Sequence, residues 1–164
     1  MVEGRRTRSR VIWFVTAGAA IALLAALFGR TFAASDDDSE SPRTMSFVVH
    51  FSPFNVIELP PEGLSVGDIT VFHDELFNAD EKQVGDEAGY CPVTKLIATG
   101  VEIVCTVAVS LAEGQITLQG VATNAPTKPL AVTGGTRHYR ATRGEAELVE
   151  NGDGTGTLTL HLAG

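Results

Sequence analysis

Apolar and polar residues alternate along most of the chain after residue 45, and this alternation constrains the fold more than any other feature. Residues two apart in an extended segment point to the same face, so each run predicts a β-strand with one buried face. Shorter runs of the same kind occur at 116–118 and 158–162. In the clearest run, the apolar positions are Val101, Ile103, Cys105, Val107, Val109 and Leu111.

Turn-forming residues separate these runs and set the number of strands. Eight short strands joined by tight turns favour an all-β, eight-stranded antiparallel up-and-down barrel over an open sheet, because closure removes the edge strands. A two-sheet sandwich is the alternative architecture. The turns are expected at Pro60–Gly63, Asn78–Asp80, Thr99-Gly100, Glu113-Gly114, Gly134-Gly135 and Asn151–Gly154. Eight strand blocks are expected, near 45–51, 54–59, 67–78, 89–98, 101–112, 115–124, 128–133 and 143–162; the last is a hairpin, so the blocks hold nine strands, one more than the ring requires.

The first 34 residues have a different composition. Four arginines within residues 1–10 precede Val11–Phe28, which has no charged residue over 18 positions. A basic flank followed by an apolar helix is typical of a signal peptide or a transmembrane anchor, and both alternatives remain open. Residues 35–44 read as an acidic, solvated linker and 45–164 as the barrel. We therefore expect an exported protein, secreted or anchored in the membrane by its N-terminal segment.

The charge distribution excludes one class of partner. The chain has 12 basic and 20 acidic residues, of which five basic and one acidic lie in residues 1–33, so 7 and 19 remain, a net charge of −12. Such a surface repels phosphate backbones and carries no basic stripe. We expect no nucleic-acid binding.

Four segments resemble a known family. They read GDITVFHDELFN at 67–78, VGDEAGYC at 84–91, GQITLQG at 114–120 and LAVTGGTRHYRATRG at 130–144. In this order they resemble the allene oxide cyclase/dirigent β-barrel superfamily, especially its secreted or membrane-anchored actinobacterial members. The superfamily architecture is also similar to that of the barrel Diels–Alderases of spirotetronate and polyether pathways. The resemblance implies the barrel much more specifically than any reaction.

The resemblance also implies which side chains face the interior. Plant cyclases have a cavity-facing asparagine at the position of Asp74, so Asp74 is expected inside and is the first catalytic candidate. A carboxyl group in an apolar cavity has a raised pKa and can exchange a proton or a hydrogen bond. Alternatively, Asp74 pairs with a basic side chain as a structural staple. Tyr90 is the second catalytic candidate, as a donor to a substrate carbonyl. The expected substrate-binding residues are Phe72, Leu76, Cys91, Val93, Leu118 and Tyr139.

The two cysteines permit two interpretations. The resemblance aligns Cys91 with a cysteine that lines the cavity of the cyclases, which implies a free thiol in the lumen. However, Cys91 and Cys105 are 14 positions apart and flank the Thr99-Gly100 turn almost symmetrically. That placement brings them near each other across a hairpin, and in an exported protein it predicts a disulfide.

Three further positions bear on the site. His73 and Glu75 alternate with Asp74, so they are expected to point outward. Their spacing lacks a third ligand, and we predict no metal site. Arg137 stands where the family has glycine after GGT, and glycine suits a positive-φ turn, so the arginine implies a different or mildly strained turn.

Three functions fit these observations. The first is a cyclase without cofactor, which folds a small, apolar, polyene or polyketide-like molecule inside the barrel and so removes entropy from the barrier to ring closure. The second is a dirigent-like barrel that binds such a molecule without catalysing a reaction. The third is a structural protein of the cell envelope with a filled barrel. Family members form dimers or trimers, so the resemblance makes a homo-oligomer plausible.

Overall fold

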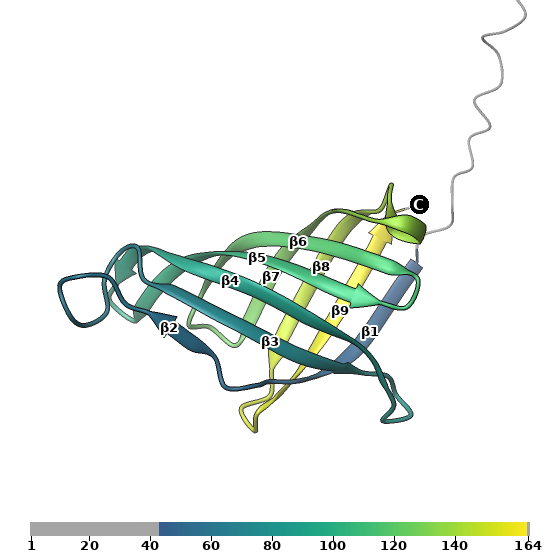
Figure 1. Cartoon of the computed structure of the whole chain (residues 1–164), viewed down its shortest axis with the longest axis horizontal. Helices are drawn as coiled ribbons and strands as arrows, with labels where there is room; N and C mark the ends of the chain where they lie inside the picture. Colours follow the sequence, from purple (N-terminus) through teal and green to yellow (C-terminus); the bar gives the residue numbers. More distant parts are fainter. Residues whose placement is uncertain (1–42, 164) are drawn as a thin grey trace, which may run out of the picture. The chain divides into compact units, whose positions relative to one another are not determined.

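The strands of the protein close into a ring. The computed structural model describes residues 43–163 (Figure 1), so the expected N-terminal helix and most of the linker lie outside the described residues. Among residues 43–163, no helix has the length and apolar character needed to span a bilayer. The strands are β1 (Arg43–His50), β2 (Asn55–Ile57), β3 (Ile69–Phe77), β4 (Gln83–Ile97), β5 (Gly100–Leu111), β6 (Gly114–Thr123), β7 (Thr127–Gly135), β8 (Arg143–Glu150) and β9 (Thr155–Ala163), with the 3₁₀ helix η1 (Arg137–Tyr139) between β7 and β8.

The eight-stranded antiparallel barrel predicted from the alternation is confirmed. The ring consists of β1 and β3 to β9, each paired with its neighbour in sequence, and β1 closes it by pairing with both β9 and β3. The expected strand at 54–59 is not a member of the ring. This segment contributes only the three-residue β2, which pairs with the first three residues of β3, 69–71.

β4 differs most from the expected strand at 89–98, because it begins at Gln83. Its first half, with Gly85 and Gly89, has the composition of a turn, yet both glycines are in the strand for steric reasons. A Cβ atom on Gly85 would lie 2.2 Å from the carbonyl oxygen of Ser110 on β5, and one on Gly89 would lie 2.6 Å from the ring of Phe72 on β3. The glycines therefore allow close approach of neighbouring groups within the sheet.

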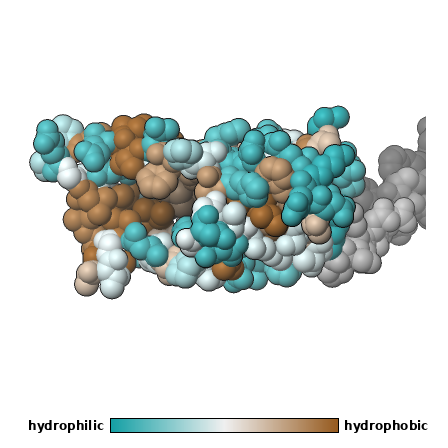
Figure 2. Space-filling model, turned by 90° about the horizontal axis from the view of Figure 1, so that it is seen from below, coloured by the Kyte–Doolittle hydropathy of each residue, from teal (hydrophilic) through white to brown (hydrophobic). Residues whose placement is uncertain are grey.

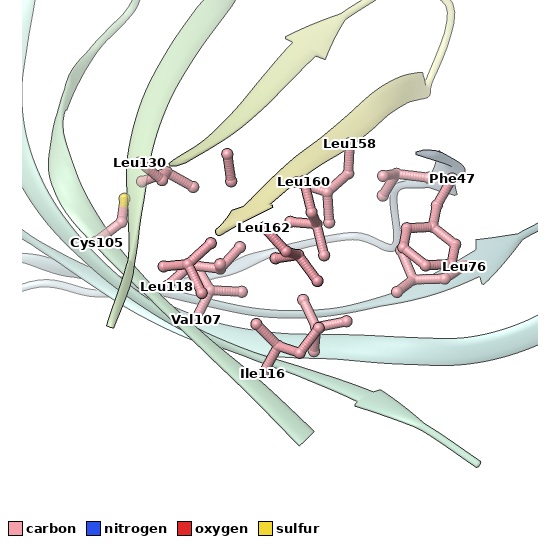
Figure 3. Packing of buried hydrophobic residues seen from close by; sticks show 14 of the residues in the cluster. Phe47, Leu76, Cys105, Val107, Ile116, Leu118, Leu130, Leu158, Leu160 and Leu162 are labelled. Atoms are coloured by element: carbon pink, nitrogen blue, oxygen red, sulfur yellow. The ribbon is translucent and has the colours of Figure 1, made fainter. Parts of the chain in front are cut away.

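The alternating apolar residues meet inside the ring. Leu160 and Leu162 from β9 point toward Val107 and Leu118 from β5 and β6 (Figure 3), and all of them belong to one buried cluster. Fully buried members such as Val109 and Ile116 lie on the same inward faces. The predicted inner faces of 101–111, 116–118 and 158–162 are thus confirmed.

One end of the barrel is closed by polar and aromatic contacts around η1. Tyr139 is buried, and its hydroxyl donates to Oε2 of Glu113 at 3.3 Å. The guanidinium group of Arg43 lies 5.8 Å from the centre of the Tyr139 ring, and its Nη1 is 3.2 Å from Nε2 of His138. Arg137 begins η1 with a φ of 54°, so this chain keeps a positive-φ backbone there despite the arginine side chain.

The opposite end carries exposed apolar side chains, which we call the apolar collar. Figure 2 shows the hydrophobic surface gathered at the end of the barrel that holds β2, away from the hydrophilic end. Asp68, which is buried, orders the segment that supplies most of the collar: its carboxyl accepts hydrogen bonds from the N–H groups of Leu59 and Ser65 at 2.8 and 2.7 Å. The collar consists of Phe54, Val56, Ile57, Leu59, Leu64, Val66 and Leu96, all between 44% and 65% exposed.

Cys91 and Cys105 form a disulfide that joins β4 to β5 on the inner face. The disulfide interpretation is therefore confirmed, and the free thiol in the lumen is wrong. Residues 91 and 105 enclose a short loop, so the chain-entropy model gives a stabilisation of about 3 kcal/mol.

We predict that replacing both cysteines, Cys91→Ala with Cys105→Ala, lowers the free energy of unfolding by about 3 kcal/mol. Urea unfolding followed by far-ultraviolet circular dichroism measures the loss. Wild-type protein kept fully reduced serves as the control and should unfold at the same urea concentration as the double variant. Equal stability of the oxidised wild type and the double variant would contradict the prediction.

A second prediction concerns the collar segment. In Asp68→Asn, an amide N–H₂ replaces one of the two accepting oxygens, so the N–H groups of Leu59 and Ser65 are no longer both satisfied. Amide hydrogen exchange in residues 57–66 should become faster, which mass spectrometry of peptides detects. Asp153→Asn is the matched control, because Asp153 accepts from Thr155 in the β8–β9 turn and its loss should leave 57–66 unchanged.

Candidate functional site

Two carboxyl groups face each other inside the barrel. Asp74 on β3 and Glu87 on β4 are direct cross-strand partners, and each is only 3% exposed. Side chains at opposed positions in an antiparallel pair lie close together on one face, so the two carboxyl groups form a pair. The expectation that Asp74 points inward is confirmed, and its outward neighbours His73 and Glu75 are exposed, as predicted.

Asp74 has a protein donor. The backbone N–H of Ser52, in the segment that follows β1, donates to its Oδ1 at 2.7 Å. Burial raises the pKa of Asp74, while the Ser52 hydrogen bond and the nearby His73 act in the opposite direction. Asp74 therefore does not pair with a basic side chain within residues 43–163, which argues against the structural-staple interpretation.

Glu87 is as buried as Asp74 but has no donor among residues 43–163. The neighbours at its level are Asp74 on β3 and Val109 on β5. Burial, with a smaller contribution from the charge of Asp74, raises the pKa of Glu87 to about 7. At pH 7 Glu87 therefore carries a proton about half of the time, and it is the group that can present this proton to a ligand.

An aromatic ring lies beside the pair. Phe72 is the next inward residue on β3 and is paired with Gly89, and the missing side chain at position 89 gives its ring room against β4. Along β3 the inward positions change from partly exposed at Thr70 and Phe72 to buried at Asp74 and Leu76. The site thus combines a flat apolar surface with a proton donor deeper in the barrel.

The structure separates the other expected site residues into two groups. Leu76, Cys91, Val93 and Leu118 are buried on the inner face, between 0% and 5% exposed. Tyr90 is 50% exposed, because it neighbours the inward Cys91 and so points to the outer face. The catalytic role expected of Tyr90 inside the barrel is therefore wrong.

Tyr139 is inside the barrel but is already engaged. Its hydroxyl donates to Glu113 at the closed end, and burial raises the pKa of Tyr139. The helix η1 folds the ring inward, 5.8 Å from the guanidinium group of Arg43. Tyr139 therefore lies at the closed end of the barrel, and its expected role in substrate binding stays a prediction.

Glu87 is the functional residue that sequence reasoning missed, although a signal for it existed. It precedes Cys91 by four positions, so an inward Cys91 on an extended strand places Glu87 inward as well. The strand was expected near residues 89–98, which left Glu87 outside it. No group of three or more metal-ligating side chains occurs within residues 43–163.

Comparison with known proteins supports the same fold. A family model described as allene oxide cyclase barrel like domain matches residues 50–156. No curated protein matches the chain. A solved structure of a pyocyanin demethylase is 26% identical, covers 74% of this chain and 100% of its own, and superposes with a TM-score of 0.68.

Two groups of more distant structures share the barrel fold. The Diels–Alderase AbmU from Streptomyces koyangensis is 14% identical with a TM-score of 0.57, covering 88% of this chain and 81% of its own. The pterocarpan synthase dirigent protein GePTS1 is 16% identical with a TM-score of 0.56, covering 74% and 82%.

The raised pKa of Glu87 gives a testable dependence of stability on pH. Its pKa is 4.5 in the unfolded chain and about 7 in the fold, so folding takes up a proton between these values and stability falls as pH rises through that window. Glu87→Gln has no titratable group at this position, so its folding stability should not fall with pH for this reason. We expect the unfolding free energy of the variant, relative to wild type, to increase by about 3 kcal/mol from pH 4.5 to pH 8.

Urea unfolding at pH 4.5, 6 and 8 measures the difference. Glu75→Gln is the matched control, because Glu75 lies on the outer face next to Asp74, and it should show no such increase. A Glu87→Gln curve parallel to that of wild type across the range would contradict a carboxyl group that titrates near neutrality.

Proposed function

The chain belongs to the family of the allene oxide cyclase barrel like domain, and from this premise we propose that it is a cyclase that works without a cofactor. Its substrate would be a flexible, polyunsaturated, polyketide-like molecule that the barrel folds into a reactive shape. Ring closure, of Diels–Alder type or a related cyclisation, would follow within the bound molecule. The observation that carries the proposal is the buried Asp74–Glu87 pair, whose Glu87 has no donor or acceptor partner among residues 43–163.

The pair suits this chemistry for two reasons. A neutral Glu87 donates a hydrogen bond to a carbonyl that activates the substrate, and the donor is fixed in an apolar surrounding where such a bond polarises strongly. Holding the reacting ends together removes much of the entropic barrier to closure, so no stronger acid or base is required. The ring of Phe72 next to the pair offers a face on which conjugated carbon atoms can lie.

The direction of entry follows from the two ends of the barrel. The collar end is apolar, and the inward side chains nearest to it on β3 are partly exposed. The other end is occupied by Tyr139, Arg43 and Glu113. We therefore assign the collar as the mouth through which the substrate passes to Glu87.

A second candidate function rests on the structural neighbours. The pyocyanin demethylase is the structure at 26% identity, and GePTS1 is a dirigent protein. Demethylation of a small molecule, or binding of one without catalysis, is therefore the alternative to cyclisation.

Turnover by the purified full-length chain separates these functions. The substrates are a linear triene that carries an activated alkene conjugated to a ketone, and pyocyanin for the demethylase alternative, each followed by liquid chromatography. The cyclase predicts cyclised product above the uncatalysed rate. Binding of the triene with no acceleration favours the dirigent-like barrel, and demethylation of pyocyanin alone favours a demethylase.

Within the cyclase, we predict that Glu87→Leu lowers kcat by about 100-fold, the loss expected when one donor to a developing oxyanion is removed. The double variant Glu75→Gln/Asp86→Gln is the matched control, because these residues are paired on the outer face of the same two strands and their change should leave kcat within twofold. Wild-type turnover in Glu87→Leu, with the fold intact by circular dichroism, would remove Glu87 from the mechanism.

We also propose that the barrel works outside the cytoplasm, secreted or held at the membrane by the N-terminal segment, and as a homo-oligomer. The Cys91–Cys105 disulfide supports export, because disulfides persist in oxidising compartments. Fractionation of producing cells, with mass measurement of the mature N-terminus, tests both the location and the cleavage.

A further inference from the structure

The inner wall of the barrel has acids but no free base. Within residues 43–163, two basic side chains stand at inward positions, and both are at strand ends and engaged. Nζ of Lys128 on β7 lies 2.6 Å from Oε1 of Glu150 and donates to the carbonyl of Ala125. Arg43 contacts His138 and Tyr139 at the closed end. A negatively charged ligand would therefore find no counter-ion beside Asp74 and Glu87.

The two carboxyl groups differ in what they still require. Asp74 already accepts the Ser52 N–H, which favours its ionised form. Glu87 is equally buried and has no donor within residues 43–163, so it is the member of the pair that keeps the proton and can offer it to an acceptor. β3 presents Asp74 to it and β5 presents Val109, so no positively charged group faces Glu87 from the neighbouring strands.

On β3, the inward side chains between the collar and the pair carry no charge. The collar side chains are apolar, and behind them stand Thr70 and Phe72 on the inward face of β3. A charged group loses its hydration on such a path and regains it only if an opposite charge is waiting at the end. An uncharged carbonyl group loses much less hydration free energy than a charged group, and it gains a hydrogen bond from Glu87 at the end.

We infer that the barrel takes its substrate carbonyl end first, as an uncharged ketone, ester or amide, and rejects the corresponding carboxylate. The inference deepens the proposed function, since it names the chemical class that the Asp74–Glu87 pair selects. Glu87 donates to the carbonyl oxygen, Asp74 holds the negative charge of the pair, and Phe72 lies along the conjugated chain. A carboxylate would place a third acidic group against the pair.

The experiment compares three ligands on one scaffold: a linear conjugated triene that ends in a primary amide, in a carboxylate or in an ammonium group. Binding to the full-length chain is measured by calorimetry at pH 6.5, where the carboxylate ligand is ionised. We expect the amide to bind about 100-fold more tightly than the carboxylate, because repulsion between like charges in a low-dielectric site reaches this size. The amide should also bind more tightly than the ammonium ligand.

Variants show that the selection resides in the pair. The double variant Asp74→Leu/Glu87→Leu should reduce the amide preference to less than about threefold, because both the donor and the negative charge that repels the carboxylate are lost. The outer-face variant Glu75→Gln/Asp86→Gln should keep the full preference, which excludes a general effect of surface charge. In wild type, amide binding should also weaken as pH rises through the pKa of Glu87, about 7, and this change should be absent in Glu87→Leu.

Equal binding of the amide and the carboxylate would overturn the inference, and so would tightest binding of the ammonium ligand, which would make the pair a cation site. A preference that survives in Asp74→Leu/Glu87→Leu would also overturn it. The readout is binding, so it is independent of turnover. A barrel that selects the amide yet cyclises no triene would retain the inference and refute the proposed cyclase.

Discussion

Closure of the sheet at β1 is the constraint on which the rest of the structure depends. β1 pairs with β9 along its whole length but with β3 only from Val48 to His50. Beyond His50 the chain turns away, and the N–H of Phe51 bonds to the carbonyl of Gly154. The short seam leaves the inner part of β3 without a full partner on that side. In this gap the backbone N–H of Ser52 donates a hydrogen bond to the side-chain carboxylate of Asp74.

This arrangement explains how the barrel tolerates two adjacent buried acids. A buried ionised carboxylate requires donors, and the seam supplies one to Asp74 through the Ser52 N–H. Glu87 receives none, and its pKa rises to about 7 in response. A neutral carboxyl group is cheaper to bury than a charged one, but it still lacks a partner. The Glu87 carboxyl group thus stays available to a bound acceptor, and a carboxyl group with so strongly raised a pKa inside a barrel is a candidate for a functional site.

The alternation along the chain predicted the ring, because a period of two over short segments with turns between them permits few other folds. The inward positions of Asp74, Phe72 and Leu76 could also be predicted, from the resemblance. The start of β4 could not, since Gly85 and Gly89 signal a turn locally and are kept in the strand only by atoms of Phe72 and Ser110 on neighbouring strands. That error left Glu87 outside the predicted strand, so its inward position could not be predicted.

Different interactions shape the two ends of the barrel. One end is closed by polar and aromatic contacts and the other carries the apolar collar, so the two ends of the interior are not equivalent. At the closed end, η1 turns Tyr139 inward, where its hydroxyl needs Glu113 and its ring meets Arg43. At the mouth, Asp68 holds the segment after β2 by donors from Leu59 and Ser65, so the apolar collar is a fixed feature of the fold. The hydrogen bonds of the buried Asp68 carboxylate fix apolar side chains that remain exposed to water, so they add no buried apolar surface to the core. Such an arrangement is expected where an apolar molecule must be met before it reaches the interior.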